Sequence, residues 1–206
     1  VELDAATIQH LHETTLQVQQ RFHEAVSLSS EFLPSSIRIK PRSLQSLHMT
    51  LFFGGETIFA LPVNELQSWY KSVSKRLGAA GFGRSAGNVD TDFAFQLREI
   101  RVFPPRHNNL LVAILEAAPG WHQLHNDLRE MARESGSLGL QDTVRYGKNE
   151  WIAHITLANL IGPKKKNRAQ TEVLQKILSD VKLKSEPVYP SGIAMGGPIP
   201  EQIELN

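Results

Sequence analysis

The chain has 206 residues, of which 41% are hydrophobic and 21% are charged, so it is long enough to bury a substantial core. A formal net charge of +1 argues against the broad basic surface that coats nucleic acid, whereas a small or end-bound anionic substrate stays compatible. The absence of cysteine excludes disulfides, thiolate nucleophiles and zinc sites with Cys ligands. Catalytic chemistry would therefore use His, carboxylate, hydroxyl, Lys or Arg side chains.

The apolar runs of the chain are short. The longest, such as residues 110 to 115, fall far below the roughly 20 residues that a membrane-spanning helix needs. No basic segment followed by an apolar stretch opens the chain. We therefore expect an intracellular protein of the cytoplasm or nucleus, without membrane association.

The first half of the chain predicts a helix, a strand and a second helix. Asp4 is a good N-cap, and apolar residues recur at helical spacing from there to about Val26. The run 47–53 is rich in β-forming residues and ends at two glycines, which predicts a strand. Pro62 begins a segment with one apolar face, and we expect this helix to end at Gly78.

The second half predicts a meander followed by alternating helices and strands. Three short strand-like runs, 93–97, 100–103 and 110–115, are separated by turns and suggest an antiparallel meander. After them we expect a helix over 119–133, a strand over 151–160, a helix over 168–181 and one or two short C-terminal strands. The order of elements is a loose internal duplication.

Two of the predicted strands carry the same His-x-Thr motif. It reads His48-Met49-Thr50 in the first half and His154-Ile155-Thr156 in the second. Because alternate side chains of a strand share a face, each His stands beside its Thr while the middle residue faces the core. Random placement of the His and Thr residues would supply about a third of one such motif. The evidence for a functional pair therefore comes from the β-rich setting of the two motifs and their matching positions in the two halves.

Two such pairs across one cleft would suit phosphodiester cleavage without a metal. One neutral His accepts a proton from the nucleophile, and the other, as imidazolium, protonates the leaving oxygen. The unperturbed pKa of histidine, near 6.5, suits both roles. The two Thr hydroxyls can donate to non-bridging phosphate oxygens in the transition state.

The sequence around each motif resembles a known superfamily. Residues 47–56 read LHMTLFFGGE, and residues 151–158 read WIAHITLA. Both segments resemble the signatures of the 2H phosphoesterases, which include RNA 2′,3′-cyclic phosphodiesterases (2′-5′ RNA ligase-like proteins) and the 2H domain of A-kinase anchoring proteins. Gly55 and Ala153 depart from the usual Leu and Pro, and neither position supplies an acid, a base or a donor.

The resemblance implies an α+β fold in which residues 1–206 form a single bilobal 2H phosphoesterase domain. Two antiparallel sheets would flank a central cleft with helices on the outside, and each motif would lie on a central strand. The implied activity is that of a hydrolase in RNA processing, opening 2′,3′-cyclic phosphates on RNA ends or nucleotides. It would need no metal and no cofactor, and the self-contained cleft predicts a monomer.

The implied catalytic residues are His48, Thr50, His154 and Thr156. We assign His154 as base and His48 as acid, although the symmetry of the halves allows the reverse. Alternative functions are a 2′-5′ oligoadenylate or 3′ exonucleolytic RNA phosphodiesterase, and a non-catalytic nucleotide-binding or scaffold module. RNA ligation, by reversal, would be a side activity.

Aromatic and basic side chains near the motifs are candidates for substrate binding by stacking or by forked hydrogen bonds. They are Phe52, Arg106, Tyr146 and Trp151, with Arg101 as a further cation beside the meander. Phe52 and Trp151 are equally compatible with packing in the core. His122 and His125 lack carboxylate or Cys partners at ligand spacing, so we expect surface histidines and no metal site.

Overall fold

The computed structural model describes residues 1–28, 37–52, 61–79, 93–103, 109–134, 151–162, 168–195 and 201–203. The helices are α1 (Ala5–Ser27), α2 (Val63–Ala79), α3 (Pro119–Glu134) and α5 (Arg168–Ser179), with a 3-10 turn η1 (Leu44–Ser46). The strands are β1 (Glu2–Leu3), β2 (Arg38–Pro41), β3 (Phe95–Phe103), β4 (Leu110–Ala117), β5 (His154–Ile161), β6 (Pro190–Met195) and β7 (Glu201–Ile203). The predicted α+β class is confirmed.

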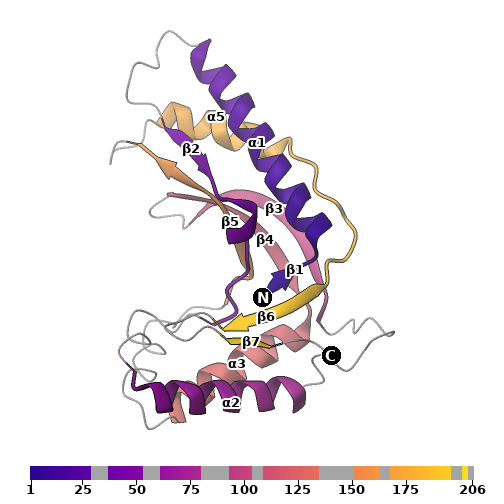
Figure 1. Ribbon diagram of the computed structural model, residues 1–206. Coiled ribbons are helices and arrows are strands. Elements are labelled where there is room, and N and C mark those ends of the chain that lie inside the picture. The colour runs from indigo at the N-terminus through magenta and orange to yellow at the C-terminus, as the bar shows by residue number, and fades with distance from the viewer. Residues whose placement is uncertain are drawn as a thin grey trace.

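The strands form two antiparallel sheets (Figure 1). One has the order β1-β6-β7, and the other has the order β2-β5-β4-β3. In the four-stranded sheet β5 is central, with Leu160 paired to Ile39 of β2 and Ile155 paired to Ala113 of β4. Helices α1 and α5 contact each other and strands of this sheet, while α2 and α3 lie at the opposite end of the molecule (Figure 1).

The predicted helices agree with the structure to within a few residues. The carboxylate of Asp4 accepts the backbone N–H of Thr7 at 2.8 Å, as expected of an N-cap at the start of α1. α2 runs one residue past Gly78, its predicted end. Within the described ranges, no helix is both long and apolar enough to cross a membrane.

The predicted meander is wrong in one respect, because its first two runs are a single strand. β3 stays paired to β4 from Phe95 to Phe103, and the register shifts once, between Leu97 and Glu99. A bulge of this kind accommodates an extra residue without ending the ladder. The exposed charged residues Arg98 and Glu99, which read as a turn in the sequence, lie at this bulge.

The strand predicted over 47–53 is not a regular strand in the part of it that the structure describes, up to residue 52. β2 pairs with β5 as far as Pro41, and the N–H of Arg42 donates to the carbonyl of Leu157 at 2.8 Å. The chain then leaves β5 for the η1 turn and returns at Met49, which forms an isolated antiparallel bridge to Ile155. The first motif therefore lies along the same edge of β5 as β2.

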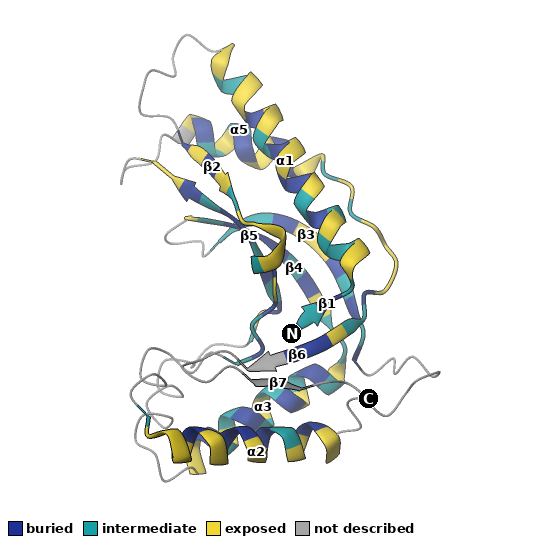
Figure 2. Ribbon diagram, in the orientation of Figure 1, coloured by how far each residue is buried: buried dark blue, intermediate teal, exposed yellow. Residues whose placement is uncertain are grey.

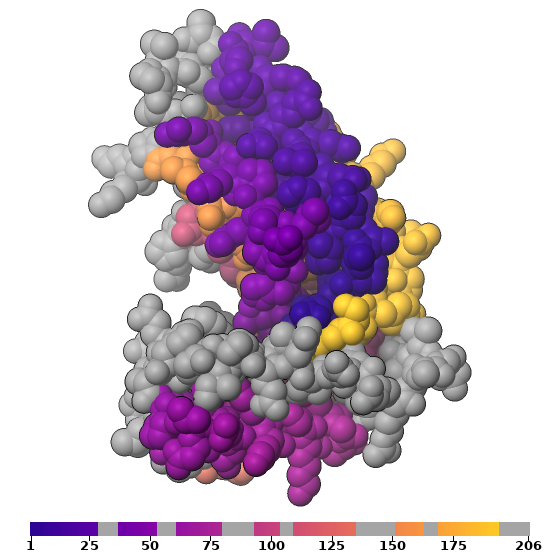
Figure 3. All heavy atoms as spheres, in the orientation of Figure 1, coloured from indigo at the N-terminus to yellow at the C-terminus, as the bar shows by residue number. Residues whose placement is uncertain are grey.

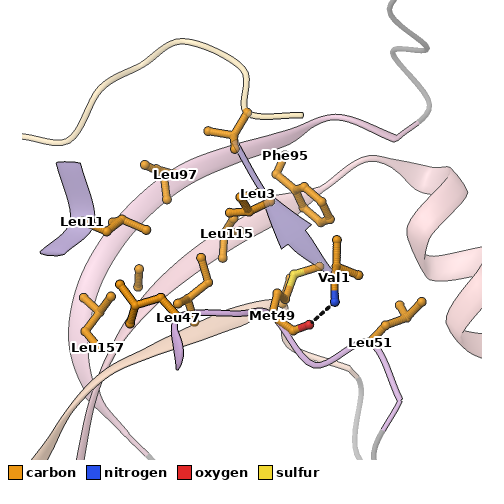
Figure 4. Packing of buried hydrophobic residues seen from close by; sticks show 14 of the residues in the cluster. Val1, Leu3, Leu11, Leu47, Met49, Leu51, Phe95, Leu97, Leu115 and Leu157 are labelled. Carbon is orange, nitrogen blue, oxygen red and sulfur yellow. Dashed lines mark hydrogen bonds between the residues drawn. The ribbon is translucent and has the colours of Figure 1, made fainter. Parts of the chain in front are cut away.

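Met49 also connects this edge to the N-terminal segment (Figure 4). Its N–H donates to the carbonyl of Val1 at 3.0 Å, and the amino group of Val1 donates back at 2.7 Å. Val1 leads directly into β1 of the three-stranded sheet. Met49 thus connects the two sheets. It is hydrogen-bonded to Val1, which leads into β1, and it forms a β-bridge with Ile155 of β5.

The hydrophobic core continues beneath this junction. Met49 and Ile155 are both fully buried, in one cluster with apolar residues of α1, α2, α3 and both sheets. Along β5 (Figure 2), half-buried and buried positions alternate from His154 to Leu157, which matches the pleat, and Ala158 is buried as well. The assignment of residues 1–206 to a single domain stays a prediction.

We expect Met49→Ala to lower the free energy of unfolding by about 2–5 kcal/mol, because truncation leaves a cavity at a fully buried site. Met49→Leu, which nearly conserves volume, should cost less than about 1.5 kcal/mol. Urea denaturation of both variants measures the difference. Equal stability of the two variants would contradict a packed junction at this residue.

Candidate functional site

The bridge between Met49 and Ile155 brings the two His-x-Thr motifs side by side. In an antiparallel pair with this register, His48 lies opposite Thr156 and Thr50 lies opposite His154. Opposed Cβ atoms are about 4.5–5.5 Å apart, and diagonal neighbours are about 7–8 Å apart, somewhat less between their Cβ atoms. The two histidines therefore occupy one diagonal of a four-residue array, and the two threonines occupy the other.

The array faces away from the core. Leu47, Met49 and Leu51 are buried, whereas His48 is exposed and Thr50 is half-buried. In the second motif Ile155 is buried while His154 and Thr156 are half-buried. In Figure 3 the purple atoms of the segment that carries the first motif run down this side of the molecule, between indigo α1 and orange β5. The alternation predicted from the sequence is confirmed in both motifs.

Both imidazoles are anchored in the same way. Nδ1 of His48 lies 3.0 Å from the carbonyl oxygen of Ser46, and Nδ1 of His154 lies 2.8 Å from that of Ile152. A carbonyl oxygen can only accept, so we infer that Nδ1 carries the proton in each neutral ring. Each Nε2 is then left with a lone pair to accept a proton, or, once protonated, with a proton to donate.

The hydroxyls of Thr50 and Thr156 have no hydrogen-bond partner among the described residues. Each can therefore donate to a bound oxyanion without first breaking an internal bond. The part of the chain that the structure describes contains no group of three or more His, Cys, Asp or Glu side chains arranged to hold a metal ion. A groove of about 430 Å³ lies elsewhere, between α1 and β2, and includes neither motif.

Two residues of β3 reach this face: Arg101, which was named from the sequence as a candidate cation, and Phe103, which was not. The ring of Phe103 lies 5.1 Å from that of His154, centroid to centroid. The guanidinium carbon of Arg101 lies 5.8 Å from the centroid of Phe103. Positions 101 and 103 share a strand face by alternation, but their proximity to His154 depends on the order of strands in the sheet.

Phe52 is half-buried and packs against the core, with its ring 6.0 Å from that of Trp69 in α2 and tilted by 44°. It lies two residues after Thr50, beyond a bend at Leu51. Its predicted role in stacking on a substrate stays a prediction. Arg106 and Tyr146 lie outside the described residues.

Trp151 connects α3 to the first motif. Its indole N–H donates to the carbonyl of Thr50 at 3.2 Å. Its ring stacks on His125 at 5.3 Å with an interplanar angle of 14°, and meets His122 edge-on at 5.5 Å. These two histidines are therefore half-buried ring contacts of Trp151, and the expectation of surface histidines is wrong. Whether Trp151 also contacts a substrate stays a prediction.

Burial of His125 lowers its pKa from 6.5 to about 4, and the nearby positive charge of Arg129 acts in the same direction. A hydrogen bond to Asn126 opposes the shift, and His122 adds to it. The imidazole that stacks on Trp151 is therefore neutral at physiological pH. The backbone of Thr50 is therefore held by Trp151, whose ring stacks on an uncharged His125.

The chain is similar to the crystal structure of TT0787 of Thermus thermophilus, with 22% sequence identity and a TM-score of 0.45. The likeness covers 91% of this chain and 90% of that one. No family model matches the chain, and no curated protein matches it.

The lowered pKa of His125 predicts acid-dependent stability. Between about pH 6.5 and pH 4 the unfolded state binds a proton at this histidine that the folded state does not, so stability falls as the pH drops through this window. We expect His125→Gln to lose less stability than wild type between pH 7.5 and pH 4.5. Urea denaturation at several pH values measures this, and parallel pH profiles for the two proteins would contradict it.

Proposed function

We propose that the chain is a metal-independent phosphodiesterase that opens 2′,3′-cyclic phosphates on RNA ends or nucleotides. The observation that carries the proposal is the Met49–Ile155 bridge, which brings two imidazoles and two hydroxyls onto one face. The matching carbonyl anchors of His48 and His154 add to it, because they prepare both Nε2 atoms for proton transfer. The resemblance of both motifs to those of the 2H phosphoesterases supplies the substrate class.

The proposed reaction uses the two histidines, which occupy one diagonal of the four-residue array. Nε2 of His154 accepts a proton from a water molecule as that water attacks phosphorus. The bond from phosphorus to one ribose oxygen breaks, and Nε2–H of His48 protonates that oxygen as it leaves. The diagonal separation of the two residues, about 7–8 Å and somewhat less between their Cβ atoms, leaves room for one phosphate between the two imidazoles. The near symmetry of the array is equally compatible with exchanged roles.

The two threonines bind the phosphate in this mechanism. Thr50 and Thr156 lie on the other diagonal, so their hydroxyls approach the phosphate from the two sides that the histidines leave free. Hydrogen bonds to the non-bridging oxygens would stabilise the charge that develops during attack. The indole N–H of Trp151 holds the backbone of Thr50 and thereby helps to position its hydroxyl.

We further propose that the protein works as a monomeric, bilobal unit inside the cell. The continuous buried cluster beneath both sheets supports the single unit. The four side chains of the proposed site all come from one chain, so catalysis would not need a partner subunit.

The proposal predicts that His48→Ala and His154→Ala each lower kcat by about 10²–10⁴-fold, because each removes one proton-transfer group. Thr50→Val and Thr156→Val should each cost roughly 10²–10³-fold if their hydroxyls stabilise the transition state. His23→Ala, at an exposed position of α1, is the matched control and should keep wild-type activity. Turnover of 2′,3′-cyclic nucleotides and of a cyclic-phosphate-ended oligoribonucleotide is followed in EDTA by mass and phosphatase sensitivity.

The same assay separates the alternative functions. Cleavage of a 2′-5′ oligoadenylate, or stepwise removal of 3′ nucleotides, would favour the other phosphodiesterase activities over the cyclic one. Nucleotide binding without turnover would favour a binding or scaffold module. Full activity in both His→Ala variants would reject the acid–base assignment, and loss of wild-type turnover in EDTA would reject the metal-independent mechanism.

A further inference from the structure

The guanidinium of Arg101 is a cation beside the proposed site with unused hydrogen-bonding capacity. Nη1 forms an ion pair with Glu99 at 3.2 Å, on a side chain that is 39% exposed. Nε is buried and has no hydrogen-bond partner within the described residues. A buried donor without a partner is uncommon in folded proteins and often indicates a bound water or ion.

Strand register puts Arg101 on the face that carries the four-residue array. Thr156 pairs with Val112 of β4, and Val112 pairs with Arg101 of β3. Side chains directly opposite each other in a sheet point to the same side, so all three residues share a face. The Phe103 ring lies on this face too, 5.8 Å from the guanidinium carbon of Arg101 and 5.1 Å from the imidazole of His154.

The spacing argues against a contact between Arg101 and the reacting phosphate. Arg101 lies two strands from Thr156, roughly 9–10 Å from Cα to Cα. Its guanidinium carbon lies over the Phe103 ring, 5.8 Å from the centroid. The cation is instead placed for a second anionic group of the same substrate.

We propose that Arg101 binds a second phosphate, so that the site favours cyclic-phosphate ends that carry a further phosphate over nucleoside cyclic phosphates that carry none. The substrate class is then a 2′,3′-cyclic end with a neighbouring phosphate, as in an oligoribonucleotide or a 5′-phosphorylated nucleotide. Phe103 contacts both the guanidinium and the imidazole of His154. This inference rests on the proposed function, and its test has one arm that does not require turnover.

The kinetic arm compares adenosine 2′,3′-cyclic phosphate with and without a 5′-phosphate. Wild type should show the higher kcat/KM for the 5′-phosphorylated substrate, and Arg101→Gln should lower that preference about tenfold, the loss expected for one charge-assisted hydrogen bond. Arg101→Lys, which keeps the charge without the fork, should show an intermediate preference. Arg98→Gln is the matched control, because Arg98 is an exposed arginine of the same strand that pairs with Glu116. It should keep the wild-type preference.

The binding arm uses calorimetric titration with adenosine 3′,5′-bisphosphate and with adenosine 3′-phosphate. Tighter binding of the bisphosphate that is lost in Arg101→Gln and kept in Arg98→Gln supports the second phosphate site, even if no cyclic substrate is turned over. An unchanged preference in Arg101→Gln, in either arm, would overturn the inference. So would an equal loss for both ligands, which would indicate a structural role or a contact with the reacting phosphate. Absence of turnover with an Arg101-dependent bisphosphate preference would count against the proposed hydrolysis alone.

Discussion

The arrangement of the site depends on one pairing, the antiparallel bridge between Met49 and Ile155. These two fully buried side chains fix which face of each extended segment meets the core, so the histidines and threonines must lie on the other face. A slip of one residue would send His48 into the core and expose Met49. Because burying an unpaired imidazole and exposing a large apolar side chain are both unfavourable, the hydrophobic core enforces the register of the polar array.

The two histidines also share one local contact. In each motif the imidazole folds back onto the carbonyl two residues earlier, that of Ser46 or of Ile152. This contact is local, because donor and acceptor are two residues apart in the sequence. The chain thus prepares two equivalent imidazoles from two unrelated stretches of sequence, and any difference between acid and base must come from more distant neighbours. Phe103 and Arg101 are neighbours of this kind on the side of His154.

Much of the fold and the polar faces of both motifs could be predicted because they follow from local periodicity. Helix ends near Asp4 and Gly78 and the alternation through His48 and His154 depend only on nearby residues. The η1 turn and the return of the chain at Met49 could not be predicted, since they are fixed by pairing with β5 about a hundred residues away. The bulge in β3 was missed for a similar reason, because exposed charges in a strand resemble a turn.

The supporting residues were harder to predict than the motifs, and the cause is physical. Trp151 and His125 are brought together by the packing of α3, and neither lies in a pattern that specifies a partner. Alternation predicts that Arg101 and Phe103 lie on one face of β3. That this face lies near His154 follows only from the strand order β5-β4-β3, which the sequence does not specify. The described helices that contact the four-stranded sheet, α1, α3 and α5, contribute residues to the buried cluster on its apolar side. The opposite face of the sheet can therefore carry the four polar side chains of the two motifs, with Arg101 at their edge, because the hydrophobic core lies on the other face.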